Sequence, residues 1–299
     1  MNGIINVYKE KDYTSFDVCA LLRGILKTKK VGHTGTLDPN AEGVLPVCIG
    51  NATKLCDFFT DKEKEYVAEF ELGKRTDTLD IWGEVLEKRE PVVSVEELKN
   101  AILSFTGGYE QVPPMYSAKK VNGQKLYDMA RDGKTIERKP VFVDIKEIGI
   151  LDISYPKAKI RVRCGKGTYI RSLCEDIGKK CGELAYMTSL IRTRVSGFSI
   201  DSAVKLSDIT RLRDEGRIEE YIMPVDDCFK EYPKLTVKPE FRKLIDNGNK
   251  LFYNMVDGDF SKENGTLVRI YNNDDIFTGI FVVNVIDKTL KPFKMFMGE

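Results

Sequence analysis

The sequence predicts a globular protein that combines helices and strands, the ingredients of an α+β fold, on three observations. Behind Thr14 or Ser15, apolar residues recur at helical spacing at positions 16, 19, 22 and 26, which predicts a capped helix. Residues 64–73 alternate apolar and polar side chains, as a half-buried strand does. Residues 141–154 and 157–164 predict two further strands joined by a turn.

Weaker signals supply the remaining elements. The chain starts with an apolar run that predicts a first strand, and residues 44–49 predict a buried strand. Residues 51–59 predict a helix, and Ser94-x-x-Glu97 is a capping box that opens another, ending near residue 105. Beyond Tyr232 the pattern changes to short strands and turns, with strands expected at 235–237, 267–271 and 277–287.

The length and composition indicate one large domain and a smaller one. The chain has 299 residues, of which 42% are apolar and 31% charged, the proportions of a soluble globular protein. There is no run of about 18 apolar residues, so no membrane span is expected. The N-terminus lacks a basic stretch followed by an apolar one, so no signal peptide is expected.

Cysteine and histidine usage narrows the chemistry. Seven cysteines without a C-x-x-C pair indicate free thiols in a reducing, cytoplasmic setting and argue against a zinc site. The only histidine is His33, which excludes a histidine-rich metal site. Any mechanism of the Ser-His-Asp or Cys-His type would have to use it. The sequence therefore predicts no bound metal.

The net charge of +1 hides a segregated distribution. Residues 157–194 hold ten basic and three acidic side chains, and residues 107–140 hold seven basic and four acidic ones. Residues 208–231 reverse the balance, with four basic and eight acidic side chains. Along residues 157–164, Lys159, Arg161 and Arg163 share one strand face. This pattern is compatible with a basic surface for phosphates or with ordinary solvated faces.

The most unusual segment is GHTGTLDPNAEG at residues 32–43. It holds three glycines, His33 and the Asp38-Pro39 step. Glycine permits unusual backbone angles, and proline restricts the residue before it to an extended conformation. We expect an ordered loop that projects the Asp38 carboxylate in a set direction. Taken alone, an aspartate before proline is also a common structural turn.

The whole string, continued by VLP at 44–46 and GNATK at 50–54, resembles the signature of the TruB-type pseudouridine synthases. That family isomerises uridine 55 in the T loop of transfer RNA. Its nucleophile is the aspartate of G-x-x-G-T-L-D-P, which the resemblance places at Asp38. His33, beside it, is expected to fill the space left by a flipped uridine; alternatively it packs the loop.

A second segment, KEKDYTS at residues 9–15, is similar to the family's K-P-x-G-x-T-S string. Lys9, Thr14 and Ser15 match, while Glu10 and Asp12 replace the proline and the glycine. The resemblance implies that Lys9 is a phosphate or structural contact. By itself it reads as an ordinary surface lysine.

Three further motifs carry expected site residues. Tyr66 matches the K-x-Y tyrosine that lies against the target base. In GTYIRSL at 167–173, Tyr169 would line the pocket and Arg171 would pair with Asp38. In SLIRTRVSGF at 189–198, Leu190 would back the flipped base, and isoleucine replaces a family arginine at position 191. By pattern alone Tyr66 and Leu190 are core residues.

Two segments have a turn or surface alternative. Asp77 and Asp80, in TDTLDIWG at 76–83, suggest either a glycosidase-like carboxylate pair or simple turn chemistry. Residues 112–133 interleave tyrosines with basic residues, which suits an RNA backbone with exposed bases or an irregular surface insertion. They resemble the family's P-P-x-Y-S-A-x-K…Y…A-R-x-G insertion, which grips the T loop.

The resemblance implies a fold and a domain plan. Residues 1–230 would form an α+β catalytic domain on a mixed, mostly antiparallel sheet, with the cleft across its middle and the RNA-gripping insertion near 107–140. Residues 231–299 would form a small β-rich, PUA-like RNA-binding domain. A monomer is the default expectation.

The implied activity is isomerisation of uridine 55 to pseudouridine in the T arm of tRNA. Substrate and product are isomers, so no cofactor is needed. A carboxylate can attack the sugar or shield an oxocarbenium-like centre, and the uridine must be flipped out of its loop. Two alternatives remain open: an RNA-folding or chaperone-like binder without chemistry, and a nucleoside hydrolase with an aspartate nucleophile.

Overall fold

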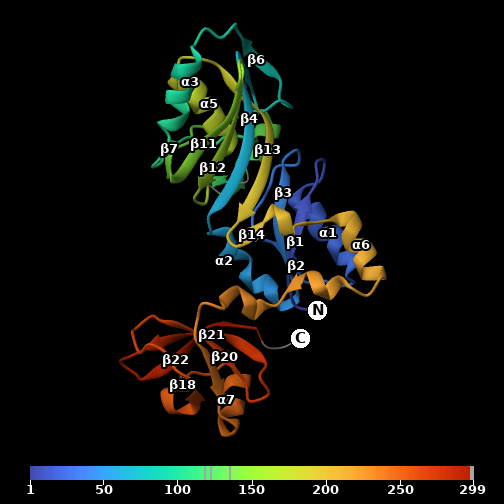
Figure 1. The fold of residues 1–299 in the computed structure, drawn as a ribbon, viewed down its shortest axis with the longest axis vertical. Coiled ribbons are helices and arrows are strands. Elements are labelled where there is room, and N and C mark those ends of the chain that lie inside the picture. Colours follow the sequence, from blue (N-terminus) through green and yellow to red (C-terminus); the bar gives the residue numbers. More distant parts are fainter. Residues whose placement is uncertain (118, 122, 135, 297–299) are drawn as a thin grey trace.

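The structure is a computed structural model that describes residues 1–296 except 118, 122 and 135. The molecule is elongated, and the N-terminus lies near the narrow region between its upper and lower parts (Figure 1). Two sheets organise it, one of ten strands and one of six. Ala118, Asn122 and Thr135, which fall within the RNA-gripping insertion predicted near 107–140, lie outside the described residues.

The ten-stranded sheet is built from segments between residues 3 and 223. Its strands are β1 Gly3–Lys9, β2 Val31–His33, β3 Glu42–Ile49, β4 Lys64–Leu72, β11 Ile145–Ser154, β12 Lys157–Cys164, β13 Ala185–Val195, β14 Phe198–Ser199, β15 Val204–Lys205 and β16 Ile222–Met223. The main order is β11-β12-β4-β13-β3-β1-β15. Neighbouring strands are antiparallel except β13 with β3 and β1 with β15. The expected mixed, mostly antiparallel sheet is confirmed.

The α-helices of the described residues are α1 Ser15–Ile25, α2 Cys56–Thr60, α3 Val95–Leu103, α4 Leu126–Arg131, α5 Ile170–Lys180, α6 Leu206–Asp214 and α7 Arg242–Asp246. Four of them cover the ten-stranded sheet in two groups, while α7 packs with the C-terminal sheet. Helices α3 and α5 pack with β4, β11, β12 and β13 around one apolar core, and α1 and α6 pack with β1 and β3 around a second (Figure 1). The two helix starts predicted from caps are confirmed, since Thr14 and Ser94 each form a capping box, whereas the helix predicted at 51–59 is a 3₁₀ helix, Gly50–Leu55, followed by α2.

The two halves of the sheet meet at one short parallel contact. Ile191 of β13 lies opposite Glu42 of β3, and Arg192 lies opposite Gly43. On one side of this junction β13 continues into the antiparallel ladder with β4 and β12. On the other side β3 continues into its ladder with β1. The loop that contains Asp38 precedes β3, so it lies at the junction.

Strand β4 follows its alternating pattern. Tyr66, Ala68, Phe70 and Leu72 are all buried, while the residues between them are partly exposed. The predicted strand over 141–154 is wrong in one respect, because it is two strands. β10 Val141–Val143 pairs with β7 Tyr109–Gln111, and β11 starts only at Ile145. The intervening Asp144 carbonyl accepts a hydrogen bond from Gly165 N, which ties the break to the loop before α5.

The charge pattern left a basic surface and an ordinary solvated face both open for β12, and the structure favours the solvated face. Lys159 pairs with Glu69 at 3.0 Å, and Arg163 pairs with Glu63 at 3.3 Å. Arg161 lies 3.6 Å from Glu147 of β11. The strand is basic along its own sequence, but neighbouring segments place carboxylates beside each cation, so the sheet surface has mixed charge.

Two smaller hairpins lie between residues 74 and 125. β5 Lys74–Thr76 pairs with β6 Val85–Lys88, and β8 Lys120–Val121 pairs with β9 Gln124–Lys125. The second hairpin and α4 belong to the segment predicted to grip RNA. No helix in the described part of the chain combines the length and apolar character needed to cross a bilayer.

The C-terminal sheet has the order β18-β22-β21-β20-β17-β19. Its strands are β17 Lys234–Val237, β18 Leu251–Phe252, β19 Val256–Asp257, β20 Leu267–Tyr271, β21 Phe277–Asn284 and β22 Thr289–Met295. The three strands predicted here are present, with β21 ending at Asn284 rather than residue 287. The β-rich character of this region is confirmed, while the boundary at 230/231 stays a prediction.

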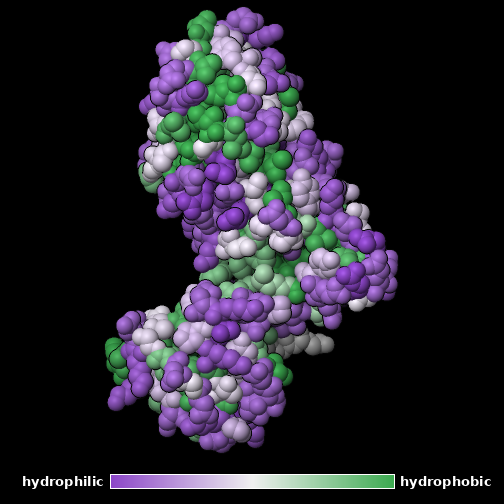
Figure 2. Space-filling model, in the orientation of Figure 1, coloured by the Kyte–Doolittle hydropathy of each residue, from purple (hydrophilic) through white to green (hydrophobic). Residues whose placement is uncertain are grey.

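One apolar cluster joins the C-terminal sheet to the rest of the molecule. Ile280 and Phe296 pack in it with Ile4, Val44 and Phe229. The Phe229 ring lies 6.4 Å from the Phe277 ring and 6.3 Å from the Phe296 ring, centre to centre. Figure 2 shows pale green and white residues at the neck, above a lower part whose visible face is mostly hydrophilic. The lower part is therefore attached through a packed apolar interface.

Candidate active site

A cleft of about 890 Å³ lies at the junction of the two half-sheets. Its walls come from the loop before β3, from β4, β10 and β13, and from the segment that leads into α5. Five predicted site residues line it, namely Asp38, Tyr66, Tyr169, Arg171 and Leu190. Two others, Lys9 and His33, are not among its lining residues.

Asp38 and Arg171 form a two-point ion pair in this cleft. Arg171 Nε lies 2.9 Å from Asp38 Oδ2, and Arg171 Nη2 donates to Asp38 Oδ1 at 3.2 Å. The Asp38 side chain is 40% exposed, whereas that of Arg171 is 5% exposed. Such a fork fixes both the position and the orientation of a carboxylate. The pairing expected from the sequence is present.

The Arg171 guanidinium is itself held by the backbone. Its Nη1 donates to the carbonyl of Thr78 at 2.9 Å, and its Nη2 donates to the carbonyl of Tyr116 at 2.7 Å. Arg171 therefore links α5, on which it lies, to the turn after β5 and to the 112–133 segment. Its planar donors allow several fixed contacts at once, which a lysine does not offer.

Asp80 stands behind this pair and was not expected there. Its Oδ2 lies 3.8 Å from Arg171 Nε. Its Oδ1 accepts from Thr78 Oγ1 at 2.6 Å and from Trp82 N at 3.2 Å, so the turn chemistry considered for it is also present. Burial raises the pKa of the Asp80 carboxyl, although Thr78 and Arg171 oppose that effect. The TDTLD string was the only sequence signal for it.

Ser15 and Lys9 hold the Asp38 loop from one side. Leu37 N donates to Ser15 Oγ at 2.8 Å, and Lys9 Nζ donates to the Pro39 carbonyl at 2.8 Å. Lys9 is fully buried, and burial lowers its pKa to about 8. Of the two roles expected for Lys9, the structural contact is confirmed. A phosphate contact, like the surface-lysine alternative, requires an exposed ammonium, which Lys9 lacks.

Asp12 occupies the position where the family's string has a glycine. Its φ is +69°, in the left-handed region where glycine is favoured and aspartate is tolerated. Its backbone N donates to the Pro39 carbonyl at 3.1 Å. The loop therefore takes a left-handed turn without glycine at this position.

Arg192 supports the loop from the other side. It is 1% exposed, and its Nε donates to the Val44 carbonyl at 2.7 Å while Nη2 donates to the Gly35 carbonyl at 3.2 Å. No carboxylate forms an ion pair with it among the described residues. Arg192 lies directly opposite Tyr66 in the β13–β4 ladder. Sequence reasoning assigned Arg192 no role, because nothing in the sequence of β13, which also holds Arg194, signals this contact.

The aromatic and apolar walls come from three elements. Tyr66 and Leu190 are 8% and 7% exposed, and burial raises the pKa of the Tyr66 hydroxyl. Tyr169 N donates to Gln111 Oε1 at 2.8 Å, and Gln111 Nε2 donates to the Tyr169 carbonyl at 3.0 Å. Gln111 therefore fixes the start of α5, which carries Tyr169 and Arg171.

His33 ends β2 at the foot of the Asp38 loop. Its Nδ1 accepts from Gly35 N at 3.3 Å. Burial, followed by the charge of Arg192, lowers its pKa. These contacts fit the loop-packing alternative, and the expected space-filling role stays a prediction.

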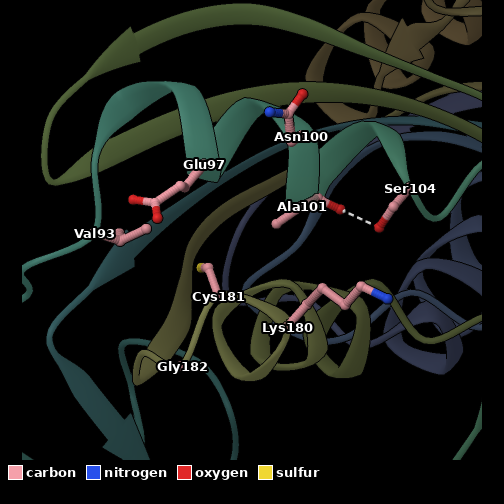
Figure 3. A pocket seen from close by; sticks show the side chains of 8 residues that line it. All are labelled: Val93, Glu97, Asn100, Ala101, Ser104, Lys180, Cys181 and Gly182. Atoms are coloured by element: carbon pink, nitrogen blue, oxygen red, sulfur yellow. Dashed lines mark hydrogen bonds between the residues drawn. The ribbon is translucent and has the colours of Figure 1, made fainter.

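A second hollow, of about 580 Å³, lies between α3 and the C-terminal end of α5 (Figure 3). Its polar side chains serve local structure. Glu97 closes the Ser94 capping box, Ser104 Oγ donates to the Ala101 carbonyl at 2.8 Å, and Cys181 Sγ donates to the Gly178 carbonyl at 3.3 Å. Figure 3 shows Glu97, Asn100 and Lys180 pointing in different directions. The polar side chains around this hollow therefore do not point toward a common position.

Neither the cleft nor this hollow suggests a metal centre. No group of three or more His, Cys, Asp or Glu side chains within the described residues is arranged to hold a metal ion. The seven cysteines are free thiols. The chemistry available in the cleft is that of one oriented carboxylate, two buried guanidinium groups and two tyrosines.

Comparisons with known proteins agree with this arrangement. Residues 23–170 match the family described as "TruB family pseudouridylate synthase (N terminal domain)", and residues 171–230 match "tRNA pseudouridylate synthase B C-terminal domain". The chain is 51% identical to tRNA pseudouridine synthase B of Lachnoclostridium phytofermentans, covering 99% of this chain and 100% of that protein. It is 43% identical to the protein of the same name from Alkaliphilus oremlandii, covering 99% and 97%.

The fold is also similar to a solved structure described as "Crystal Structure of a Cbf5-Nop10-Gar1 Complex". The TM-score is 0.73 at 25% identity, and the likeness covers 99% of this chain and 85% of the other. The similarity extends through the C-terminal sheet. It supports the order of elements described above.

Proposed function

Because the chain belongs to the TruB family of pseudouridine synthases, we propose that it isomerises uridine 55 to pseudouridine in the T loop of tRNA. Conversion of tRNA uridine to pseudouridine is the activity of this family. The position 55, the T arm as binding partner, a monomeric state and a cytoplasmic location are parts of the proposal.

The observation that carries the proposal is the Asp38–Arg171 fork. The isomerisation requires the N-glycosidic bond to break, the uracil to turn, and its C5 to bond to C1′ of the ribose. A carboxylate can attack the sugar or stabilise positive charge on it, provided that it is aimed and ionic. The 2.9 Å and 3.2 Å contacts to Arg171 aim Asp38, while its 40% exposure leaves it open to the cleft.

The remaining site residues take supporting roles in this proposal. Tyr66 stacks on the flipped uracil and lies near the C5 proton that must leave. Leu190 backs the base, and Tyr169 lines the pocket. Burial of Tyr66 and Leu190 in the cleft that holds Asp38 supports these assignments, because a water-poor cleft strengthens the electrostatic contacts within it. His33 would fill the space left in the RNA by the flipped uridine, and Lys9 supports the loop from below.

A T-arm stem-loop carrying 5-tritiated uridine at the target position tests the proposal. Forming the C5–C1′ bond releases that tritium, whereas a hydrolase would release uracil and a pure RNA binder would release neither. We expect tritium release without free uracil. Free uracil, or binding without release, would support one of the two alternatives.

The key variant is Asp38→Asn. Asparagine keeps the shape and turn chemistry before Pro39 but removes the charge that pairs with Arg171. We expect normal melting temperature, retained RNA binding and no detectable tritium release. The matched control is Asp144→Asn, a carboxylate that lines the same cleft and is also 40% exposed. A turnover rate of Asp38→Asn within tenfold of the unmodified protein, about 1.4 kcal/mol in barrier height, contradicts the nucleophile assignment.

A further inference from the structure

Phe142 is an exposed aromatic side chain in the wall of the active cleft. It belongs to β10, all three residues of which line the cleft. Phe142 is 59% exposed, whereas the next residue, Val143, is 3% exposed and packs in the core. An aromatic ring that faces water inside a functional cleft, while its neighbour anchors the strand, calls for an explanation.

The tip of the ring lies close to the backbone at Gly108. A Cβ added at Gly108 would lie 2.9 Å from Phe142 Cζ. No other aromatic ring of the described residues contacts it. Part of the ring therefore remains open to an incoming group.

The position of the ring is fixed relative to the catalytic pair. Phe142 lies opposite Glu110 in the β10–β7 ladder. The end of β7 is bonded to the start of α5 through Gln111 and Tyr169, at 2.8 and 3.0 Å. Two residues after Tyr169 is Arg171, which holds Asp38. The ring and the reacting carboxylate therefore belong to one hydrogen-bonded framework.

The chemistry around the ring suits a nucleotide. Lys119 and Lys166 line the same cleft, and Lys166 is exposed, with an ion pair to Asp61 at 2.9 Å. The wall also carries Asp144, whose charge is paired with Lys146 at 2.6 Å. An exposed aromatic ring in a cleft that also holds lysines is the arrangement that proteins use to stack a base and contact its phosphate.

We propose that Phe142 is a stacking platform for a nucleobase of the substrate RNA adjacent to the flipped uridine. The proposal rests on the proposed function, since it takes RNA as the substrate. Only the target base enters the pocket beside Asp38, so its neighbours in the strand must lie along the cleft wall. Stacking of a base on Phe142 would order the strand there and help to hold the uridine out of its loop.

The test compares variants of the full-length protein on T-arm stem-loops. Phe142→Ala should raise the KM for the stem-loop by about 5- to 150-fold, as expected for loss of one base–aromatic stack, and change kcat by less than about threefold. Phe142→Tyr should restore KM to within about threefold, and Phe142→Leu should resemble Phe142→Ala. The matched control is Phe16→Ala, a 62% exposed phenylalanine on α1 that does not line the cleft.

A series of stem-loops with single abasic nucleotides locates the partner. At the stacked position the abasic RNA should raise the KM of the unmodified protein, and Phe142→Ala should then have no further effect. The proposal is overturned if Phe142→Ala binds the intact RNA within twofold of the unmodified protein, or if its effect persists on every abasic RNA. An unmodified protein that releases no tritium would instead refute the proposed function. Melting temperatures of all variants exclude misfolding as the cause.

Discussion

Arg171 is the residue on which most of the site geometry depends. It contacts Asp38 through two nitrogens and two backbone carbonyls through the same guanidinium. Replacement by lysine keeps the charge but leaves a single ammonium at the end of a flexible chain. The lysine should orient the Asp38 carboxylate less well and hold the 112–133 segment less firmly beside the cleft.

We therefore expect Arg171→Lys to lower the single-turnover rate at saturating RNA by at least tenfold, about 1.4 kcal/mol in barrier height. Rapid-quench measurement of tritium release gives this rate. Arg163→Lys, which alters an exposed arginine paired with Glu63, serves as the control. A rate for Arg171→Lys equal to that of the control would show that the fork is not needed.

Lys9 provides a pH-dependent test of its buried position. Its pKa falls from 10.5 to about 8 because burial disfavours the charged form. Between these values the unfolded chain holds a proton that the folded protein has released, so Lys9 makes stability rise with pH. Below pH 8 the cost of burying the charge is fully present, and it disappears as pH rises through this window.

Lys9→Met removes this group and also leaves the Pro39 carbonyl without its donor. Relative to the variant, we expect the unmodified protein to gain free energy of unfolding from about pH 8 to 10.5, by up to about 1.4 kcal/mol per pH unit. Urea unfolding at a series of pH values measures the difference. Lys11→Met, at an exposed lysine two positions further along, is the control. The low pKa assigned to Lys9 is contradicted if the difference in free energy of unfolding between the unmodified protein and Lys9→Met stays constant from about pH 8 to 10.5. It is also contradicted if Lys11→Met shows the same pH dependence.

At the scale of elements, the junction of β13 with β3 depends on Gly43. Its φ is +104°, and a Cβ there would overlap the carbonyl oxygen of Arg192. Any side chain would force the two strands apart beside the loop that carries Asp38. This is a position where backbone contact requires glycine.

We expect Gly43→Ala to lower the free energy of unfolding by about 1–3 kcal/mol, the cost of a strained backbone position, and to reduce the rate of tritium release. Thermal melting and single-turnover assays measure the two effects. Gly24→Ala is the opposite control. Gly24 lies in α1, where a Cβ would point into open space, so alanine there should stabilise by about 0.5–1 kcal/mol. Equal stabilities for both variants would contradict this account of the junction.

At the scale of the whole molecule, the C-terminal sheet is joined to the remainder through Phe229. This residue is 2% exposed, and its ring lies near those of Phe58, Phe277 and Phe296. The chain beyond residue 230 therefore covers apolar surface of the catalytic part. Deleting it would expose that surface, so a truncation would not report on RNA binding alone.

Phe229→Ala tests this attachment in the intact chain. We expect a loss of about 3–5 kcal/mol, as for other buried phenylalanines, with a lower melting temperature and faster proteolysis near residue 230. Phe293→Ala, at a 58% exposed phenylalanine of β22, should change stability by less than about 0.5 kcal/mol. Proteolysis of Phe229→Ala at the rate of this control would mean that the two parts are held by other contacts.

The sequence by itself determined the local structure, and the family resemblance supplied Asp38 as the proposed reacting group. The Thr14 and Ser94 caps, the alternating faces of β4 and the loop with Asp38 all depend on residues close together in the chain, so local patterns report them. The resemblance added the Asp38–Arg171 pairing, which joins distant residues and which spacing alone does not predict. The turn at Asp12 is also a local feature, because Asp12 itself adopts the left-handed φ that the family's glycine would otherwise supply.

Only the tertiary structure decided which groups lie beside each residue. From its place in the sequence, Lys9 reads as an ordinary surface lysine. In the structure it is fully buried, because the end of β1 lies against the Asp38 loop. The basic stripe of β12 is neutralised by carboxylates from β4 and β11, and Asp80 approaches Arg171 from a separate turn. Periodicity reports that a side chain faces inward or outward, but burial and charge depend on the strands that pair with it, which are set by contacts between residues far apart in the chain.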